Sequence, residues 1–318
     1  MKKTILYRSL ALLLLFTFLL GGLLGCGKDH TTTASTTTKA VPLDEFLYVR
    51  ILDVGQADGI LLSYKDQFML IDAGNYSSGD RAQYMALLRR YNVDKIDWLI
   101  LTHPHGDHIG AAVDVLNTYQ VKNVMLPDAS YSSYAYRNTL QAILNSDADV
   151  HLVETDASQE VNTGGEGASL YRAGDEFSWE AVHFRILAPI SPDDNVNNAS
   201  IVLRATYGGV RFLFTGDMES MMERQLLTRF SKEELRADVL KVGHHGSYTS
   251  TNQSFLSAVS PRYAAISCGK DNEYGHPHGV ILNRLSYIGV QVNRTDLEGT
   301  ITYVTDGANI VVNTNKNG

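Results

Sequence analysis

Short apolar runs alternate with longer amphipathic segments from residue 46 onward. In the first half, apolar runs separated by tight turns predict strands, and two helix-length segments follow them. Strands are expected at residues 46–53, 59–64, 68–72 and 121–126 and in a run that ends at Thr102. One helix is expected at residues 79–91. A second is expected directly after the run that ends at Thr102, where a polar cluster begins the helix and residues 111–119 continue it.

The second half repeats this pattern. Further strands are expected at residues 181–187, 200–206, 210–215 and 238–242, with a helix at about 218–229. Two strand-rich halves, each followed by helices, predict an α/β fold in which two sheets pack face to face and helices cover the outside, an αββα sandwich. No short-period repeat is evident in the sequence.

The first 25 residues differ from the rest of the chain. Basic residues precede an apolar stretch at residues 10–20, which runs into paired glycines after roughly half of the about 20 apolar residues that a membrane span needs. An export signal over residues 1–25 is therefore expected. The sequence Leu-Leu-Gly-Cys at residues 23–26 resembles the bacterial lipobox, which implies lipid attachment at Cys26 and an extracytoplasmic protein anchored to the cell membrane.

The alternative for Cys26 is a disulfide with Cys268, which an exported location would permit. Residues 26–43 are rich in threonine and lack the apolar side chains needed to offset the entropy of ordering, so they predict a tether. Residues 44–318 are then expected to form the functional domain. Removing residues 1–25 leaves 24 basic against 35 acidic residues, a formal net charge of −11, so a strongly basic groove is not expected.

Four side chains of the types that ligate metals in proteins follow the apolar residues 98–101. His103, His105, Asp107 and His108 lie within six residues. In an extended segment His103 and His105 project to one side and can coordinate one ion together, while Asp107 and His108 can coordinate a second ion. Imidazole and carboxylate suit zinc or manganese, and an open two-metal centre activates water for hydrolysis. The alternative, a loop of solvated histidines, is disfavoured by four such residues so close together.

Further candidate ligands follow other predicted strands. Asp217 comes after an apolar run and can bridge two metals, although alone it would be interpreted as a turn or capping residue. His244 and His245 follow the next strand, and alternating side-chain direction predicts that one binds metal while the other faces substrate or supports a ligand from behind. Asp72, after a third apolar strand, is placed to orient a ligand histidine.

The whole constellation resembles the metallo-β-lactamase superfamily, and within it the ComEC-like hydrolases. The resemblance covers residues 46–306 and is carried by motifs at residues 52–58, 101–110, 198–200, 214–217, 241–247 and 274–277. It implies two divalent ions, zinc or manganese, bound by His103, His105, Asp107, His108, Asp217, His244 and His245. It also implies catalytic roles for Asp72, Asp107, Asp217 and His276, and substrate binding by Asn198, Ser200, Ser247 and His276.

Two positions depart from the pattern of that group. Ala57 stands where these proteins usually have glycine, and residues 197–200 offer no histidine where many superfamily members have a ligand. Two other histidines, His151 and His183, lie within or beside strand-like runs and are interpreted as structural.

The resemblance implies hydrolysis of a phosphodiester, most naturally DNA at the cell surface, in association with the channel proteins of DNA uptake. Tyr131, Tyr134, Tyr136 and Arg137 could contact such a substrate or could simply pack at the start of a helix. Alternatives are a phosphodiesterase of envelope polymers that carry phosphorylcholine or resemble teichoic acid, and a catalytically weak DNA-binding module of the uptake machinery. A β-lactamase or lactonase fits the motifs less well.

Overall fold

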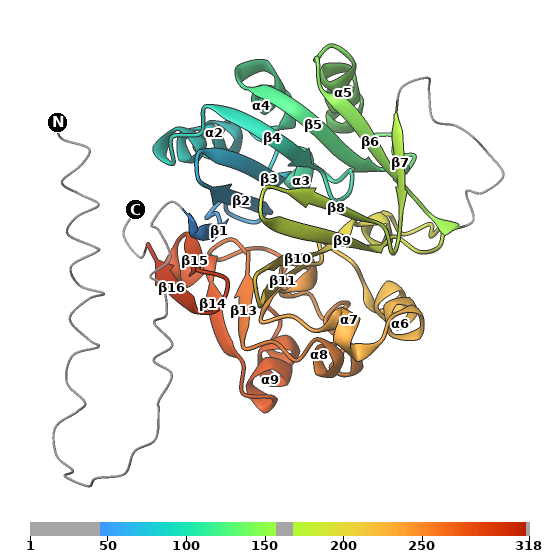
Figure 1. Ribbon diagram of the computed structural model, residues 1–318, viewed down its shortest axis with the longest axis vertical. Coiled ribbons are helices and arrows are strands. Elements are labelled where there is room, and N and C mark those ends of the chain that lie inside the picture. The colour runs from blue at the N-terminus through green and yellow to red at the C-terminus, as the bar shows by residue number, and fades with distance from the viewer. Residues whose placement is uncertain (1–44, 157–167, 316–318) are drawn as a thin grey trace, which may run out of the picture. The chain divides into compact units, whose positions relative to one another are not determined.

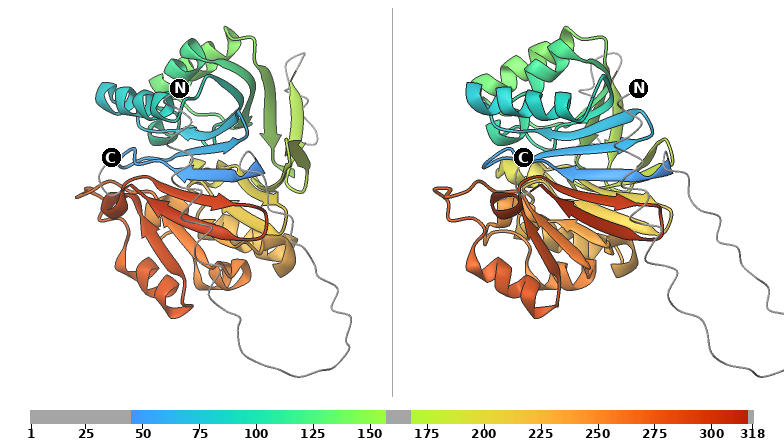
Figure 2. Two further views of the ribbon diagram at one scale, coloured as in Figure 1. Left: turned by 60° about the vertical axis from the view of Figure 1, so that its left-hand side comes forward. Right: turned by 90° about the vertical axis from the view of Figure 1, so that its left-hand side faces the viewer.

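Two β-sheets lie face to face, and helices cover the outer face of each sheet (Figures 1 and 2). The computed structural model describes residues 45–156 and 168–315, all of them within one compact unit, Val41–Gly318. The predicted signal peptide, the lipidation site Cys26 and the tether lie outside the described residues. Within the described ranges, no helix combines the length and apolar character that a bilayer crossing requires.

The first sheet has the order β16-β15-β1-β2-β3-β4-β5-β6-β7. Pairing is antiparallel from β16 to β3 and parallel from β3 to β7. Its strands are β1 (Leu47–Ile51), β2 (Gly59–Tyr64), β3 (Gln67–Ala73), β4 (Lys95–Ile100), β5 (Gln120–Pro127), β6 (Asp149–Glu154), β7 (Ser169–Arg172), β15 (Ile301–Thr305) and β16 (Ile310–Thr314).

The second sheet has the order β14-β13-β12-β11-β10-β9-β8, antiparallel from β8 to β11 and parallel from β11 to β14. Its strands are β8 (Glu176–Trp179), β9 (Val182–Ala188), β10 (Val202–Tyr207), β11 (Val210–Phe214), β12 (Val239–Lys241), β13 (Tyr263–Ile266) and β14 (Gln291–Arg294).

Helices after the first sheet's parallel strands pack on that sheet, and those from the second half pack on the other. The α-helices are α2 (Ser78–Arg90), α3 (Gly106–Ile109), α4 (Ala112–Thr118), α5 (Tyr134–Leu144), α6 (Ser220–Arg229), α7 (Lys232–Leu235), α8 (Gln253–Val259), α9 (Gly279–Tyr287) and α10 (Thr295–Glu298). Two 3₁₀ turns, η3 (Val196–Ala199) and η4 (Gly243–Gly246), precede or carry candidate site residues.

Alternation along the strands divides the buried residues into three apolar layers. In β3, Met69 and Ile71 point between the sheets, whereas Phe68 and Leu70 point toward the first set of helices. A third layer, which includes Leu240 of β12, lies between the second sheet and its helices. Two sheets with three apolar layers confirm the predicted αββα sandwich.

The helix expected from the polar cluster through Tyr119 is wrong as a single element. It is broken into α3 and α4, because the Gly110 and Ala111 amides donate to Gly74 O and Ala73 O of the segment that ends β3. A Cβ on Gly110 would lie 2.0 Å from the Asn75 carbonyl carbon, so only glycine allows this approach. The break keeps α3 directly behind β3.

Candidate metal centre

Residues at the carboxyl ends of β3 and β4 form one side of the site. Asp72 has a left-handed φ of 61°, and its Oδ1 accepts from the Thr102 amide at 2.7 Å. Asp72 Oδ2 lies 2.7 Å from His108 Nδ1 and accepts from Thr102 Oγ1 at 2.8 Å. These bonds hold the His108 ring with Nε2 directed forward, as expected for an orienting Asp72.

Loops of the second sheet supply the opposite side of the site. Asp217 follows β11 and is buried, and its amide donates to Ser200 Oγ at 3.0 Å. His244 and His245 lie in η4 after β12, with left-handed φ values of 50° and 53°. The expectation that these two rings point to opposite faces is wrong, because the segment is not a strand and both rings turn toward Asp217.

Four imidazoles surround the Asp217 carboxylate. Asp217 Oδ1 lies 3.3 Å from His108 Nε2. Asp217 Oδ2 lies 3.6 Å from His245 Nε2, 3.7 Å from His244 Nε2 and 3.9 Å from His103 Nε2. The position of Asp217 between histidines of both sheets is the one expected for a bridging ligand.

Acidic side chains stand behind three of these rings. Asp72 contacts His108, Asp58 Oδ1 lies 3.4 Å from His245 Nδ1, and Glu219 Oε1 lies 3.3 Å from His244 Nδ1. His245 Nδ1 also donates to the Ser267 carbonyl at 3.0 Å, which leaves Nε2 as the ring nitrogen that faces Asp217 and Asp107. Histidines that bind metals have such partners on the second ring nitrogen.

The geometry fits a bound divalent cation. Ligand atoms of Asp107, His108, Asp217 and His245 all lie within 4.8 Å of one another. Among the described residues, the buried atoms Asp217 Oδ1, His108 Nε2 and His245 Nε2 have no hydrogen-bond partner. Buried polar atoms normally have partners, so three of them close together are the ligand atoms that a bound cation would satisfy.

His103 and His105 form a second pair of candidate ligands beside Asp217. His103 is fully buried, and its Nε2 lies 3.1 Å from His105 Nδ1. Two ring nitrogens this close fit a shared cation, and His244 Nε2 approaches Asp217 Oδ2, the oxygen that His103 Nε2 also approaches. These three histidines are the residues that would hold a second ion.

Electrostatics couple the carboxylates to the imidazoles. Burial alone would raise the pKa of Asp217, but His108 and His245 outweigh burial and hold that pKa well below its usual range. For His245, burial would lower the pKa, yet the carboxylates of Asp217 and Asp58 raise it to about 10. Burial, reinforced by nearby His108, lowers the pKa of His103 well below its usual value. Without a cation, the carboxylates therefore keep a proton on the His245 ring at neutral pH, whereas the His103 ring is neutral.

A buried ion pair that the sequence analysis missed supports His245. Lys241 Nζ lies 2.7 Å from Asp58 Oδ2, and both side chains are 1% exposed. Lys241 also donates to the Val242 carbonyl at 3.0 Å. Asp58 and Lys241 both lie in segments that carry the family resemblance, yet no local pattern indicated that residues 183 positions apart would pair.

A cavity of about 300 Å³ opens in front of these ligands. It is lined by Gln56, His105, Gly106, Asp107, Asp217, His244, His245, Tyr274 and His276. The Gly269 amide donates to Gln56 Oε1, which directs Gln56 Nε2 to His276 Nδ1 at 3.2 Å. Because an amide NH₂ only donates, His276 Nδ1 accepts and His276 Nε2 carries the proton. Burial and the neighbouring rings of His245 and His244 lower the pKa of His276 to about 4, so it is a neutral donor at pH 7.

Three residues expected to contact substrate lie behind the ligands instead. Asn198 Oδ1 accepts from the Glu219 amide, and Asn198 Nδ2 donates to Asp193. Ser200 Oγ accepts from the Asp217 amide and lies 3.4 Å from His103 Nδ1. Ser247 is buried and accepts from Thr249. Their hydrogen bonds position the ligand loops and leave the cavity wall to other residues.

Other candidates are placed as follows. Tyr131 lies beside the site with its ring 5.3 Å from the His105 ring, whereas Tyr136 is buried in α5 and donates to Ala129 O. His151 bonds Asn123 and His183 contacts Ser178, so both are structural. Cys268 is buried against Asp296.

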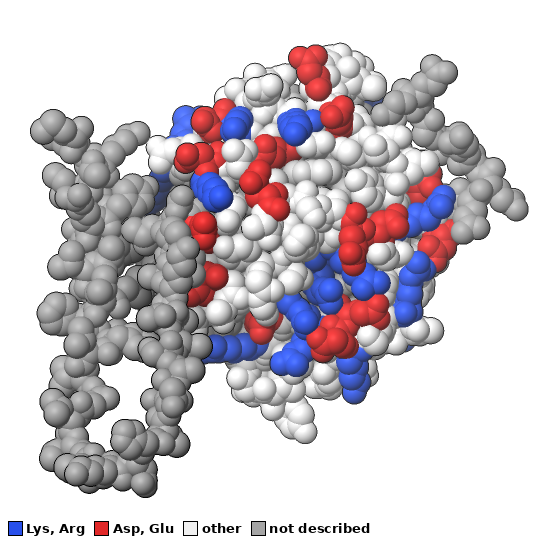
Figure 3. Space-filling view, in the orientation of Figure 1, with Lys and Arg blue, Asp and Glu red and all other residues white. Residues whose placement is uncertain are grey.

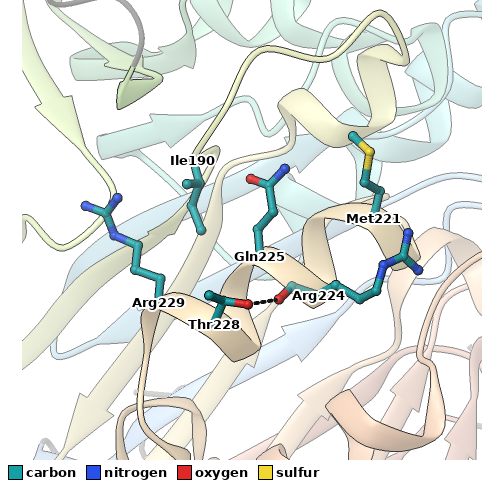
Figure 4. Close-up of a pocket in the computed structure, with 6 residues that line it drawn as sticks. All are labelled: Ile190, Met221, Arg224, Gln225, Thr228 and Arg229. Atoms are coloured by element: carbon teal, nitrogen blue, oxygen red, sulfur yellow. Dashed lines mark hydrogen bonds between the residues drawn. The ribbon is translucent and has the colours of Figure 1, made fainter.

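A larger hollow of about 410 Å³ lies along α6 (Figure 4), and it shares no lining residue with the cavity in front of the ligands. It is lined by Ile190, Met221, Arg224, Gln225, Thr228 and Arg229. The lining contains no histidine or carboxylate, so this hollow has no hydrolytic chemistry to offer.

Comparison with known families agrees with the site. The profile described as "Metallo-beta-lactamase superfamily" matches residues 52–166 and 194–270, more than half of the chain. The chain belongs to the metallo-β-lactamase superfamily. Members of this superfamily are generally metal-dependent hydrolases, and the Asp107, His108, Asp217 and His245 cluster is the candidate metal-binding site of this one.

Relatives within the superfamily carry names from competence. The chain is 34% identical to "ComE operon protein 3" of Bacillus subtilis over 80% of its length and 32% of the relative's. It is 30% identical to "Competence protein ComA" of Neisseria gonorrhoeae, over 83% of its length and 33% of that protein. The chain thus spans about a third of the length of these relatives. The resemblance to the ComEC-like group is confirmed.

A solved structure supports the fold alone. The diiron β-hydroxylase CmlA from Streptomyces venezuelae is 13% identical, with a TM-score of 0.50, over 81% of this chain and 54% of CmlA.

Proposed function

We propose that this protein is a metal-dependent phosphodiesterase that cleaves DNA at the cell surface and serves DNA uptake, anchored through a lipid on Cys26. The cluster of Asp107, His108, Asp217 and His245, facing a cavity with a neutral donor at His276, is the observation that carries the proposal. The competence names of the relatives favour DNA as the phosphodiester. Channel proteins of competence are the proposed partners.

Two divalent ions, zinc or manganese, are the proposed cofactors. Asp107, His108 and His245 would hold one, His103, His105 and His244 the other, and Asp217 would contact both. When bound, the ions supply Lewis acidity and activate water for attack on phosphorus. Among the residues of the chain, Asp72 and Asp58 hold the ligand rings in place. His276 Nε2–H is placed to donate to a phosphate oxygen at the cavity wall.

A phosphodiesterase of envelope polymers is the second candidate. No lysine or arginine is among the residues that line the cavity. On the described surface in Figure 3, basic and acidic side chains are interspersed, without a continuous basic band. DNA binding usually draws much of its affinity from basic contacts with phosphates, so this observation favours a smaller or less charged substrate.

The test compares two substrates. The full-length protein, loaded with manganese or zinc, is given labelled single-stranded DNA and, separately, bis(p-nitrophenyl) phosphate. His105→Ala is the test variant, and His183→Ala, a surface histidine outside the site, is the matched control. Metal-dependent DNA cleavage that is lost in His105→Ala supports the nuclease. Cleavage of the small diester alone moves the proposal to envelope phosphodiesters, and DNA binding without any turnover favours a binding module.

A further inference from the structure

Exposed tyrosines gather around the mouth of the metal-site cavity. Tyr76, Tyr131, Tyr248 and Tyr274 are 58%, 37%, 62% and 67% exposed. They come from four different loops, which follow β3, β5, β12 and β13, so both sheets contribute. Large exposed apolar groups are costly in a protein surface, and their concentration at one place marks an interaction site.

Contacts fix these tyrosines beside the candidate ligands. Tyr274 lines the cavity, and its ring stacks on His276 at 5.5 Å with an interplanar angle of 21°. The Tyr131 ring stands edge-on to His105 at 5.3 Å. Both side chains remain partly open to solvent, Tyr274 more than Tyr131.

The remaining two tyrosines also lie at the edge of the cavity mouth, and the four tyrosines together are called the rim. The Tyr248 ring lies 5.0 Å from the His278 ring, and the Tyr248 amide donates to His278 Nδ1. The His278 ring in turn lies 4.9 Å from the ring of His276, which lines the cavity. Tyr76 borders Gly106, where its Cβ would lie 3.8 Å from a Cβ placed on that glycine. Gly106 itself lines the cavity, so Tyr76 stands at its edge.

The chemistry of the rim is aromatic instead of basic. The cavity lining holds histidines, carboxylates, one glutamine and Tyr274, and no lysine or arginine. A polymer bound here would gain affinity from stacking on rings more than from pairing with phosphates. Each unpaired nucleobase offers a flat face for such stacking, whereas the bases of a duplex cover each other's faces.

We propose that Tyr76, Tyr131, Tyr248 and Tyr274 are stacking positions for unpaired bases that flank the scissile phosphodiester. The substrate is accordingly single-stranded nucleic acid, and duplex ends must separate before they are cleaved. This inference rests on the proposed phosphodiesterase function. It also accounts for a nucleic-acid enzyme with an acidic balance, because stacking needs no cationic surface.

The experiment measures KM and kcat of the metal-loaded full-length protein on three substrates of equal length. These are a single-stranded oligonucleotide, its abasic analogue with an intact phosphodiester backbone, and the matching blunt duplex. Variants Tyr274→Ala, Tyr274→Phe and Tyr131→Ala are compared with Tyr287→Ala. Tyr287 is 84% exposed at the end of α9 and serves as the matched control.

The expected result is a rise in KM of about tenfold for each alanine variant, the loss that one stacked base implies. Tyr274→Phe keeps the stacking ring and stays near wild type, as does Tyr287→Ala. For the wild-type protein, KM on the abasic analogue and on the duplex is raised by the same factor over KM on the single strand. On the abasic analogue, Tyr274→Ala raises KM little further.

Two results would overturn the inference. Efficient cleavage of single-stranded DNA with unchanged KM in both alanine variants, or on the abasic analogue, rejects base stacking and leaves the nuclease proposal standing. No cleavage of DNA by the wild-type protein, with turnover of bis(p-nitrophenyl) phosphate, rejects the nuclease proposal and this inference together.

Discussion

At the scale of single residues, the site depends on polar side chains that fix one another in a buried setting. Asp72, His244 and His245 all have positive φ values, which cost about 1–3 kcal/mol each in non-glycine residues. Such conformations persist where surrounding contacts impose them, and here they turn the His244 and His245 rings toward Asp217 and the Asp72 carboxylate toward His108. The same burial makes each ligand sensitive to the loss of the partner behind it.

The Asp58–Lys241 ion pair gives the clearest test at this scale. Lys241→Met leaves the Asp58 carboxylate buried without its cation, and we expect a loss of about 3–5 kcal/mol in the free energy of unfolding. Urea denaturation of the metal-free protein measures it. The double variant Asp58→Asn with Lys241→Met should recover part of the loss, and a single variant within about 1 kcal/mol of wild type contradicts the prediction.

Asp58→Asn on its own tests the orientation of His245. The amide keeps the size of the carboxylate but holds the His245 ring less firmly, and loss of such a partner typically lowers metal affinity about 10- to 100-fold. Zinc titration by calorimetry measures this change. Unaltered affinity would show that the Ser267 carbonyl alone orients His245.

At the scale of elements, short segments hold the ligand loops against the strands. The turn between α3 and α4 presses on the segment after β3 through Gly110. The loop between η4 and α8 is held by Glu223 of α6, which accepts from the amides of Thr251 and Asn252. These contacts join segments that carry ligands to helices that do not.

Gly110→Ala tests the first contact. The new methyl group would meet the backbone of Asn75, and since backbone cannot move aside, we expect a loss of about 3 kcal/mol or more in unfolding free energy. Gly79→Ala is the matched control, because that position in α2 faces open space and helical alanine is favoured by about 0.5–1 kcal/mol. Equal stability of the two variants would contradict the close approach.

Glu223 tests the second contact through pH. Burial raises the pKa of Glu223 from 4.5 to about 7, although the amides of Asn252 and Thr251 oppose the shift. The stability that Glu223 contributes is therefore complete below pH 4.5 and lost as pH rises through about 7. From pH 5 to pH 8, the free energy of unfolding measured in urea should fall by about 2 kcal/mol more in the wild-type protein than in Glu223→Gln. Parallel pH profiles would disprove this prediction.

At the scale of the whole described unit, the two sheets meet across an apolar layer and bring their strand ends to one site. His108 from the first sheet and Asp217 from the second come within 3.3 Å of each other. Neither half holds a complete ligand set. Cation binding is therefore expected to stabilise the packing of one sheet on the other.

Metal removal tests this coupling. Saturation with zinc at about 100 times the dissociation constant adds about 2.7 kcal/mol, so chelation should lower the melting temperature by about 5 °C or more. Re-addition of zinc should restore it in thermal unfolding experiments. In Asp217→Asn, the zinc-dependent change in melting temperature should be less than half of the wild-type change. A shift of the same size in that variant would place the stabilising ion elsewhere.

Part of the fold and much of the chemistry could be predicted from the chain alone. Apolar runs predicted β1–β5 and β9–β12 to within a few residues, because burial in a sheet imposes such runs, whereas β6–β8 and β13–β16 were not predicted. His103, His105, Asp107 and His108 were recognisable because they are neighbours in the chain. Asp72 and Asp217 followed from their positions after apolar strands.

Contacts between distant positions of the chain could not be predicted from the sequence. Three features depend on contacts between segments far apart in sequence. They are the Asp58–Lys241 pair, the common direction of His244 and His245, and the burial of Asn198 and Ser200. The break at Gly110 depends on the backbone of another loop, which no helical propensity encodes. The reason is physical: periodicity reports which face of an element is buried, whereas the partner that covers each side chain is set by how the two sheets pack.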